Sequence, residues 1–169
     1  MSNESPNKLV SRKQVEETIR LERDLSGADL SGLDLSGIKL AALDMEDIDL
    51  SGANLNEALI AAANMGGANL RGARLPGAKI SAVNLENADL TESDLTGSRW
   101  FAVNVSGSDF SDAKTTDALS SAVDWSSAKV PPAEIPDPIP IPPWVPAVFA
   151  GIGLLLVVGI LLIWKRRRG

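Results

Sequence analysis

The sequence predicts an all-β solenoid with a capping helix before it and a single transmembrane α-helix after it. Three observations predict this arrangement: an apolar residue at every fifth position from Leu25 to Phe110, seven prolines within 131–143, and an uncharged, almost wholly apolar run over 145–163. The expected parts are a polar N-terminus and capping helix (1–22), a repeat domain (23–130), a Pro-rich linker (131–143), a transmembrane helix (144–164) and a basic tail (165–169).

Residues 11–22 are predicted to form the short capping helix. Ser11 suits the N-cap position and Gln14 completes a capping box, while Val10 and Val15 fit a hydrophobic staple around the first turn. A helix of about three turns is not stable alone in water. We therefore expect it to cover the N-terminal end of the solenoid.

The five-residue period is the main evidence for the solenoid. All eighteen positions at this spacing from 25 to 110 are apolar, which chance would produce on the order of once in a million. The positions two residues earlier are mostly alanine. Neither the helix period of about 3.6 nor the strand period of two matches this pattern. A chain that turns a corner every five residues buries two side chains per unit, and stacked coils of such a chain form a continuous core.

The units 28–32 (ADLSG), 53–57 (ANLNE), 68–72 (ANLRG) and 88–92 (ADLTE) resemble the A(D/N)LXX motif of the pentapeptide-repeat family. The resemblance covers about 100 of the 169 residues. It implies a right-handed quadrilateral β-helix with four pentapeptides per coil, and hence just over five coils. The repeat weakens where Thr115 and Ser120 take central positions, so we expect 113–130 to form a capping coil.

With four units per coil, residues twenty apart stack, and one side of the solenoid differs from the other three. Its segments, 38–42, 58–62, 78–82, 98–102 and 118–122, contain no Asp or Glu, whereas the other sides hold all 16 acids of the repeat domain. Small side chains and missing carboxylates lower the desolvation cost of a contact. The expected contact residues are Lys39, Ala41, Ala42, Leu59, Ala61, Ala62, Lys79, Ala82, Arg99, Phe101 and Ala102.

Three uses fit such a side: binding of a protein partner, homo-oligomerisation, or contact of its basic residues with an anionic bilayer. Compositional drift among the repeats is the alternative explanation of the pattern.

Residues 145–163 would span about 28 Å as a helix, close to the thickness of a bilayer core. The expected membrane-anchor residues are Trp144, Trp164, Lys165, Arg166, Arg167 and Arg168. Ala147, Gly151 and Gly159 fall on one helical stripe and would permit close helix packing. The linker 131–143 is expected to be an extended polyproline II spacer that reaches about 40 Å.

Two rules disagree about membrane orientation. The basic tail favours a cytoplasmic C-terminus, but residues 1–10 contain no apolar stretch of a signal peptide. The hydrophobic segment also leaves the ribosome only when translation ends. We expect a single-pass, tail-anchored protein whose repeat domain is cytoplasmic.

The composition excludes several kinds of chemistry. The chain has no Cys, His or Tyr, so disulfides, thiolate or imidazole metal sites and Cys- or His-based catalysis are excluded. Residues 1–164 carry 12 basic and 22 acidic residues, a net charge of −10, which disfavours binding to nucleic acid. We expect no enzymatic activity, cofactor or metal site, because most carboxylates occupy the outward Asp/Asn position of the repeat.

The predicted function is therefore a membrane-anchored binding or scaffold module for protein–protein contact. One alternative is an accessory subunit of a multi-subunit membrane complex. Another follows from the family resemblance: some soluble quinolone-resistance members mimic DNA and bind a topoisomerase such as gyrase, and the acidic repeat domain is similar to theirs in charge.

Overall fold

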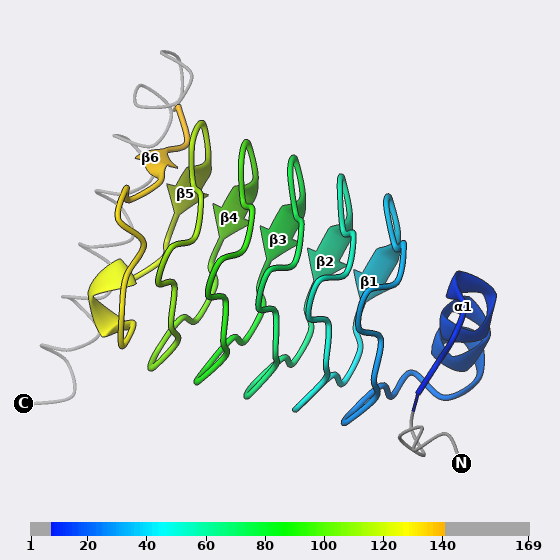
Figure 1. Cartoon of the computed structure of the whole chain (residues 1–169). Helices are drawn as coiled ribbons and strands as arrows, with labels where there is room; N and C mark the ends of the chain where they lie inside the picture. The colour runs from blue at the N-terminus through cyan, green and yellow to red at the C-terminus, as the bar shows by residue number, and fades with distance from the viewer. Residues whose placement is uncertain (1–7, 141–169) are drawn as a thin grey trace, which may run out of the picture. The chain divides into compact units, whose positions relative to one another are not determined.

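The computed structural model describes residues 8–140 (Figure 1). Its elements are α1 (Arg12–Leu21), β1 (Lys39–Ala41), β2 (Leu59–Ala61), β3 (Lys79–Ser81), β4 (Arg99–Phe101), β5 (Leu119–Ser121), the 3-10 helix η1 (Trp125–Ser127) and β6 (Asp137–Pro138). The predicted transmembrane helix (144–164), its packing stripe and the basic tail (165–169) lie outside the described residues. Between residues 8 and 140, no helix is both long enough and apolar enough to cross a membrane.

The repeat domain is a parallel solenoid of four-sided coils. Strands β1 to β5 pair in parallel with a register of twenty residues, as in Lys39↔Leu59, and form one continuous sheet. Three further ladders consist of single bridges with the same spacing inside the repeat domain. Two of them begin at Asp24↔Asp44 and Asp34↔Asn54, and the third continues from Asp29↔Asp49 after a first bridge, Lys8↔Asp29, that spans 21 residues. Figure 1 shows the successive coils side by side along the domain. The predicted four pentapeptides per coil are confirmed.

Each pentapeptide buries the two side chains that the sequence predicts. The central residue and the residue two before it point into the tube, as Leu50 and Ile48 do, both fully buried. A β-turn follows the central residue: the Leu30 carbonyl accepts a hydrogen bond from the Leu33 N–H at 3.2 Å. The residue before Leu33, Gly32, has a φ of +69°, which glycine adopts without steric cost. The frequent glycine at this position therefore reflects the corner geometry.

The side that carries β1 to β5 turns its corner differently. Between residues 23 and 123, the closing hydrogen bond of the turn is present at the corners of the other three sides but is missing after each of these strands. The corner residues here are alanines with φ between +50° and +56°: Ala42, Ala62, Ala82, Ala102 and Ala122. This side consequently contains three-residue strands instead of single bridges.

Helix α1 covers the N-terminal end, as predicted. Its N-cap Ser11 accepts a hydrogen bond from the Gln14 N–H, and Val15 is fully buried against the first coil. The Arg12 guanidinium donates to the Ser36 carbonyl at 2.6 Å, which ties the helix to that coil. The helix therefore closes one end of the hydrophobic core.

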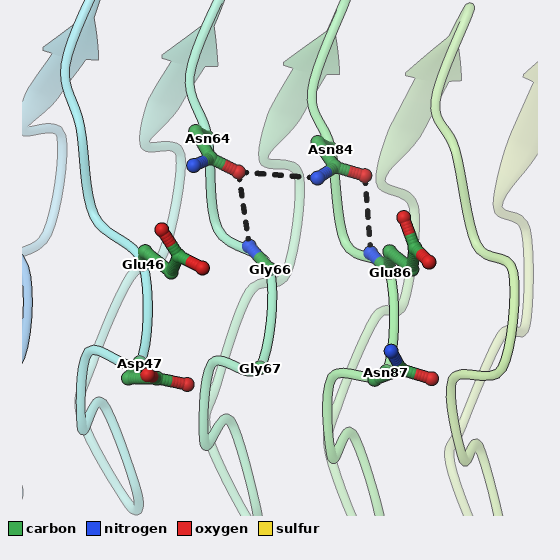
Figure 2. Close-up of a pocket in the computed structure, with 8 residues that line it drawn as sticks. All are labelled: Glu46, Asp47, Asn64, Gly66, Gly67, Asn84, Glu86 and Asn87. Carbon is green, nitrogen blue, oxygen red and sulfur yellow. Dashed lines mark hydrogen bonds between the residues drawn. The ribbon is translucent and has the colours of Figure 1, made fainter.

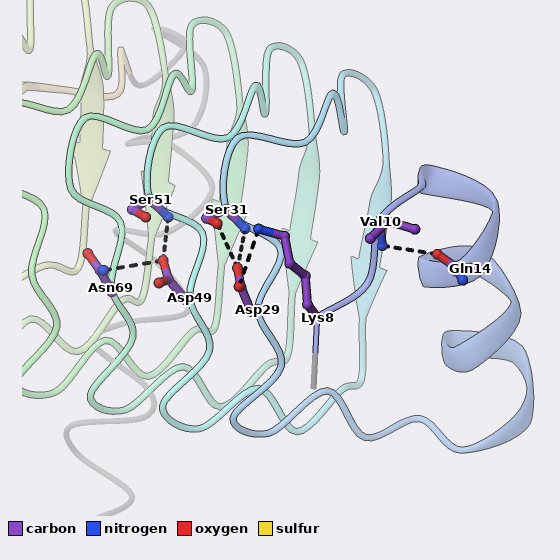
Figure 3. A network of polar contacts seen from close by, with 8 residues as sticks. All are labelled: Lys8, Val10, Gln14, Asp29, Ser31, Asp49, Ser51 and Asn69. Atoms are coloured by element: carbon purple, nitrogen blue, oxygen red, sulfur yellow. Dashed lines mark hydrogen bonds and ion pairs between the residues drawn. The ribbon is translucent and has the colours of Figure 1, made fainter. Parts of the chain in front are cut away.

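The predicted hydrophobic staple is wrong. Val10 is 59% exposed, and its N–H donates to Gln14 Oε1 at 3.0 Å (Figure 3). The preceding residue, Leu9, instead packs against the core and donates its N–H to the Asp29 carbonyl at 3.0 Å. Because adjacent residues of an extended chain point to opposite sides, this pairing turns Val10 outward.

At the C-terminal end, the regular frame persists through β5 and then breaks. Asp109 pairs with Val130, 21 residues later, and Leu119 pairs with Asp137, 18 residues later. The extra residue before Val130 is taken up near η1, and the chain is then three residues shorter than the regular frame between Val130 and Asp137. The capping coil therefore begins near Asp124, about ten residues later than predicted.

The prediction of a free spacer is wrong for residues 131–138, which form the last rung of the solenoid. The Thr115 hydroxyl donates to the Glu134 carbonyl at 2.5 Å, and the Ser120 hydroxyl donates to the Pro136 carbonyl at 3.2 Å. The Asp137 N–H donates to the Ala118 carbonyl at 3.1 Å. Proline lacks an N–H, so a proline-rich strand ends a ladder and suits an edge. Residues 141–143 of the predicted linker lie outside the described part.

An aromatic cluster fills the last coils beneath this rung. Trp100, Phe110 and Trp125 pack with ring centroids 5.4 to 6.1 Å apart. The Trp100 indole N–H donates to Ser98 Oγ at 2.7 Å, and the Trp125 indole N–H donates to Ser120 Oγ at 3.2 Å. Serine thus replaces alanine or leucine where a buried indole needs an acceptor.

Candidate protein-contact surface

The structure places all the predicted contact residues of the repeat domain on one face, the outer face of β1 to β5. We call the outward residues of these strands and the alanines that follow them the acid-free strip. Its first column contains Lys39, Leu59, Lys79, Arg99 and Leu119, and its second contains Ala41, Ala61, Ser81, Phe101 and Ser121. The alanines from Ala42 to Ala122 form the third. The role of the strip in binding stays a prediction.

The alanine column is not imposed by the backbone. On other sides the same corner position holds Glu57 and Glu92, with φ of +56° and +59°, so longer side chains are accommodated at this φ. Alanine at every corner of this one side therefore keeps the outer surface flat rather than meeting a need of the corner itself.

The basic residues of the strip have no acidic partner. Lys39, Lys79 and Arg99 are exposed, and none of them forms an ion pair within residues 8–140. By contrast, Arg71 on another side pairs with Glu92 at 2.6 Å. The strip therefore presents uncompensated positive charge on a domain that is otherwise acidic.

Lys79 and Arg99 stand next to each other. They are register partners in β3 and β4, so their backbones are separated by the strand spacing of about 4.8 Å. Together with Gly77, Gly97 and the corner residue Glu57 they line a shallow depression of about 430 Å³. Glu57 marks the rim of the strip, where the neighbouring acidic side begins.

Phe101 is the bulkiest outward side chain of the strip and is 55% exposed. Its register partners on the adjacent strands are Ser81 and Ser121, so it stands above small neighbours. Trp100, the preceding residue, points inward and is fully buried. A half-exposed phenylalanine on a flat surface is typical of an anchor residue at a protein interface.

The sequence did not reveal the C-terminal border of the strip. Strand β6 extends the sheet, and Asp137 pairs with Leu119 of β5. The exposed carboxylate of Asp137 therefore lies directly beyond Leu119, the last residue of the first column of the strip. The frame shift from twenty to eighteen residues hides this position from a periodic analysis.

Aspartates at the ladder position of the other sides take part in hydrogen bonds of the repeat itself. Asp29 accepts hydrogen bonds from the hydroxyl and N–H of Ser31, at 2.6 and 3.0 Å, which lower the pKa of the Asp29 carboxyl (Figure 3). The Ser111 hydroxyl and N–H lower the pKa of Asp109 in the same way. Asn69 Nδ2 donates to Asp49 Oδ1 across a rung, at 3.2 Å. These acids stabilise corners and ladders.

A second depression, of about 440 Å³, lies on an acidic side (Figure 2). It exists because Gly66 and Gly67 have no side chains, and its rim carries Glu46, Asp47 and Glu86. The central amides are already satisfied: Asn64 Oδ1 accepts from the Gly66 N–H at 3.3 Å and from Asn84 Nδ2 at 3.1 Å. Within residues 8–140 no three Cys, His, Asp or Glu residues are grouped so as to hold a metal ion.

The repeats also match a family model described as Pentapeptide repeats, in eight copies over residues 24–56, 58–97 and 78–114. The chain belongs to the pentapeptide-repeat family. Proteins of this family are structural or interaction modules. A comparison with curated proteins finds no match.

The chain is similar to several solved structures. One from the thylakoid lumen of Arabidopsis thaliana is 24% identical, with 60% of this chain and 69% of that chain covered and a TM-score of 0.56. HetL, involved in heterocyst differentiation regulation in Nostoc sp. strain PCC 7120, is 27% identical, with coverages of 66% and 55% and a TM-score of 0.44. QnrB1, a plasmid-mediated fluoroquinolone resistance protein, is 19% identical, with coverages of 63% and 65% and a TM-score of 0.33.

Proposed function

We propose that this pentapeptide-repeat protein is a membrane-anchored binding module that presents the acid-free strip to a protein partner. The observation that carries the proposal is the contrast between the strip, which has no acid and in which Lys39, Lys79 and Arg99 form no ion pair within residues 8–140, and three sides that hold all 16 acids of the repeat domain. Small outward side chains let a partner approach closely, and the absence of carboxylates removes a desolvation penalty.

The size of the strip makes a membrane anchor useful to this function. Five rungs at about 4.8 Å and four residues at about 3.3 Å give an area of roughly 300 Å². A stable interface takes about 800 Å² from each partner. The strip alone supports a weak contact, and restriction of both partners to one membrane raises their effective concentration.

The proposed anchor is the segment 144–164, with the basic residues 165–168 after it, and the proposed location of the repeat domain is the cytoplasm. Extraction of membranes at alkaline pH tests the anchor, because only an integral protein stays in the pellet. Protease digestion of intact cells and of inverted vesicles tests the orientation. Digestion of the repeat domain in intact cells would contradict a cytoplasmic location.

The strip is tested by the double substitution Ala62→Glu and Ala82→Glu. Both corners have positive φ, and Glu57 and Glu92 adopt the same φ elsewhere, so the domain should still fold. The control is Gly52→Glu with Gly72→Glu, at the same repeat position of another side, where a new Cβ meets nothing within 4 Å. Because replacing glycine at positive φ adds backbone strain, folding of this variant is checked first by its circular dichroism spectrum. After affinity purification from detergent-solubilised membranes, the partner should be lost from the first variant and kept by the control. Equal recovery from both variants would refute the proposal.

An accessory subunit of a membrane complex would depend on the anchor rather than on the strip. Replacement of 144–164 by an unrelated apolar helix separates the two functions, since a simple tether tolerates the exchange and a subunit that packs through Ala147, Gly151 and Gly159 does not.

The acidic sides favour a second candidate function, mimicry of DNA towards a topoisomerase. Asp29, Asp49, Asp89 and Asp109 follow one ladder along the domain. Inhibition of gyrase supercoiling by the purified protein would support this candidate, and no inhibition at micromolar protein would reject it.

A further inference from the structure

We infer that the partner of the acid-free strip is a protein surface that places carboxylates against Lys79 and Arg99 and an apolar recess around Phe101. The inference rests on the proposed function and adds the chemistry of the partner.

The first argument is the unpaired charge of Lys79 and Arg99. Like charges directly opposite on neighbouring strands destabilise a sheet, and these two are register partners. Some bases elsewhere pair with an acid across a rung, as Lys129 does with Asp109 at 3.2 Å. Lys79 and Arg99 have only the rim residue Glu57 in their depression and form no ion pair with it, so the two adjacent cations create a site of positive potential, which a carboxylate placed between them would relieve.

The second argument excludes a second copy of the same face. A twofold interface brings identical surfaces together, so each strip would meet three basic residues and no acid. Where the two copies meet at β3 and β4, Lys79 and Arg99 of one copy would face Arg99 and Lys79 of the other and repel, and the nearby acids, Glu57 and Asp137, lie only at the borders of the strip. The strip therefore favours a different, acidic surface over itself.

The third argument concerns a lipid surface. Segments that bind anionic lipid carry clusters of roughly four to eight basic residues. The strip has three, spread over four strands, on a chain whose first 164 residues carry a net charge of −10. Repulsion between the acidic sides and an anionic leaflet opposes the attraction of the strip, so a protein is the better fit.

The position of Phe101 makes the site specific. Arg99 and Phe101 lie two residues apart on β4 and both point outward, with Lys79 on the next strand. The three side chains form a compact group of two cations and one aromatic ring. A matching surface has an apolar recess bordered by carboxylates, the usual surroundings of a buried interface anchor.

The test is site-specific photocrosslinking of the full chain in its own membranes. The crosslinking residue is introduced as Phe101→p-benzoylphenylalanine, and as Asn56→p-benzoylphenylalanine for a control on an acidic side. Illumination should capture a protein at position 101 and not at 56. Mass spectrometry of the captured peptide should find Asp or Glu within a few residues of the crosslink.

Charge reversal completes the test. Lys79→Glu with Arg99→Glu should reduce the crosslinking yield about tenfold or more, whereas Lys13→Glu with Arg23→Glu, the same charge change at exposed positions that form no ion pair within residues 8–140, should leave it unchanged. Lys79→Arg with Arg99→Lys should retain the yield.

The outcomes separate the inference from the proposed function. Capture of a peptide without acidic residues, of lipid, or of a second copy of the strip would overturn the inference. If the captured species is a non-acidic protein, the strip remains a binding surface and the proposed function stands. Failure to capture anything at position 101, together with retention of the partner by the Ala62→Glu, Ala82→Glu variant, would overturn both.

Discussion

The two hydroxyls that hold residues 131–138 make the C-terminal rung testable. The perturbation is Thr115→Val together with Ser120→Ala, which removes the donors to the Glu134 and Pro136 carbonyls. The Ser120 change also removes the acceptor of the Trp125 indole N–H. The Thr115 change keeps the shape of the side chain, so the core beneath the rung should remain packed.

The size of the effect follows from these bonds. A hydrogen bond inside a protein contributes about 1 kcal/mol net, and a buried group left without a partner costs about 1–3 kcal/mol. Loss of the two hydrogen bonds from Thr115 and Ser120 to the rung, and of the acceptor of the Trp125 indole, should therefore cost about 3 kcal/mol. The backbone bond from the Asp137 N–H to the Ala118 carbonyl remains but cannot hold the rung alone. The fraction of molecules in which residues 131–138 are detached from the last coil should rise about a hundredfold, since each 1.4 kcal/mol is a factor of ten.

Hydrogen exchange with mass spectrometry measures this opening in the full chain. The peptide that contains the Asp137 amide should exchange about a hundredfold faster at that amide, while peptides from α1 to β4 should not change. The control is Thr116→Val with Ser121→Ala, two exposed hydroxyls of the same coil without a bond to the rung. Unchanged exchange at Asp137 in the first variant would refute this role of Thr115 and Ser120 and would restore the interpretation of 131–138 as a spacer.

Three further predictions follow from the repeat geometry. Gly67→Ala and Gly72→Ala should each destabilise the domain by about 1 kcal/mol in urea titrations, because both glycines have positive φ. The new Cβ at position 67 also meets Asp47 Oδ1, but this is the free end of an exposed side chain that can turn away, so the two costs should be similar. Ser98→Ala should cost about 1–3 kcal/mol because it leaves the buried Trp100 indole without its acceptor, whereas Ser93→Ala, whose hydroxyl only donates to the Leu90 carbonyl, should cost less in the same titration. The melting temperature should be constant from pH 8 to about 5 and fall below about pH 4. Hydrogen bonds lower the pKa of four carboxyls: the Ser26 N–H acts on Asp24, the Ser36 N–H on Asp34, the Ser31 hydroxyl on Asp29 and the Ser111 hydroxyl on Asp109. The stability that these carboxylates contribute is complete above their pKa in the unfolded chain and is lost as the pH falls through their lower pKa in the folded domain. A fall between pH 8 and 5 would contradict this assignment, since the chain has no histidine.

The coil architecture was predictable because a single period determines it. Every fifth residue from Leu25 to Phe110 is buried, and the twenty-residue register follows from four units per coil. The acid-free side could be assigned for the same reason, since twenty-residue stacking converts a sequence pattern into a surface.

The C-terminal rung could not be predicted because its contacts break the period. Proline within 131–143 indicates an extended chain, but it does not show whether a neighbouring strand accepts that chain. Thr115 and Ser120 appeared as weakened repeats, although they are the donors that the strand requires. The positive φ of the alanine corners was also invisible, because alanine rarely marks such a conformation. The C-terminal rung and the alanine corners both depend on hydrogen bonding and backbone conformation, which the hydrophobic pattern of a sequence does not reveal.

The two covered ends direct any protein contact of this domain to its sides. Helix α1 and the strand pairing of Leu9 close the first coil, and the proline-rich rung ends the ladder at the last one. Neither end therefore offers the open row of donors and acceptors that lets solenoids pair edge to edge. Three of the four sides carry acids, of which those at Asp29, Asp49 and Asp109 are bonded to the neighbouring turn or rung. The side chains of Lys79, Arg99 and Phe101 form no ion pair within residues 8–140, so a partner at these residues would displace no ion pair of the domain.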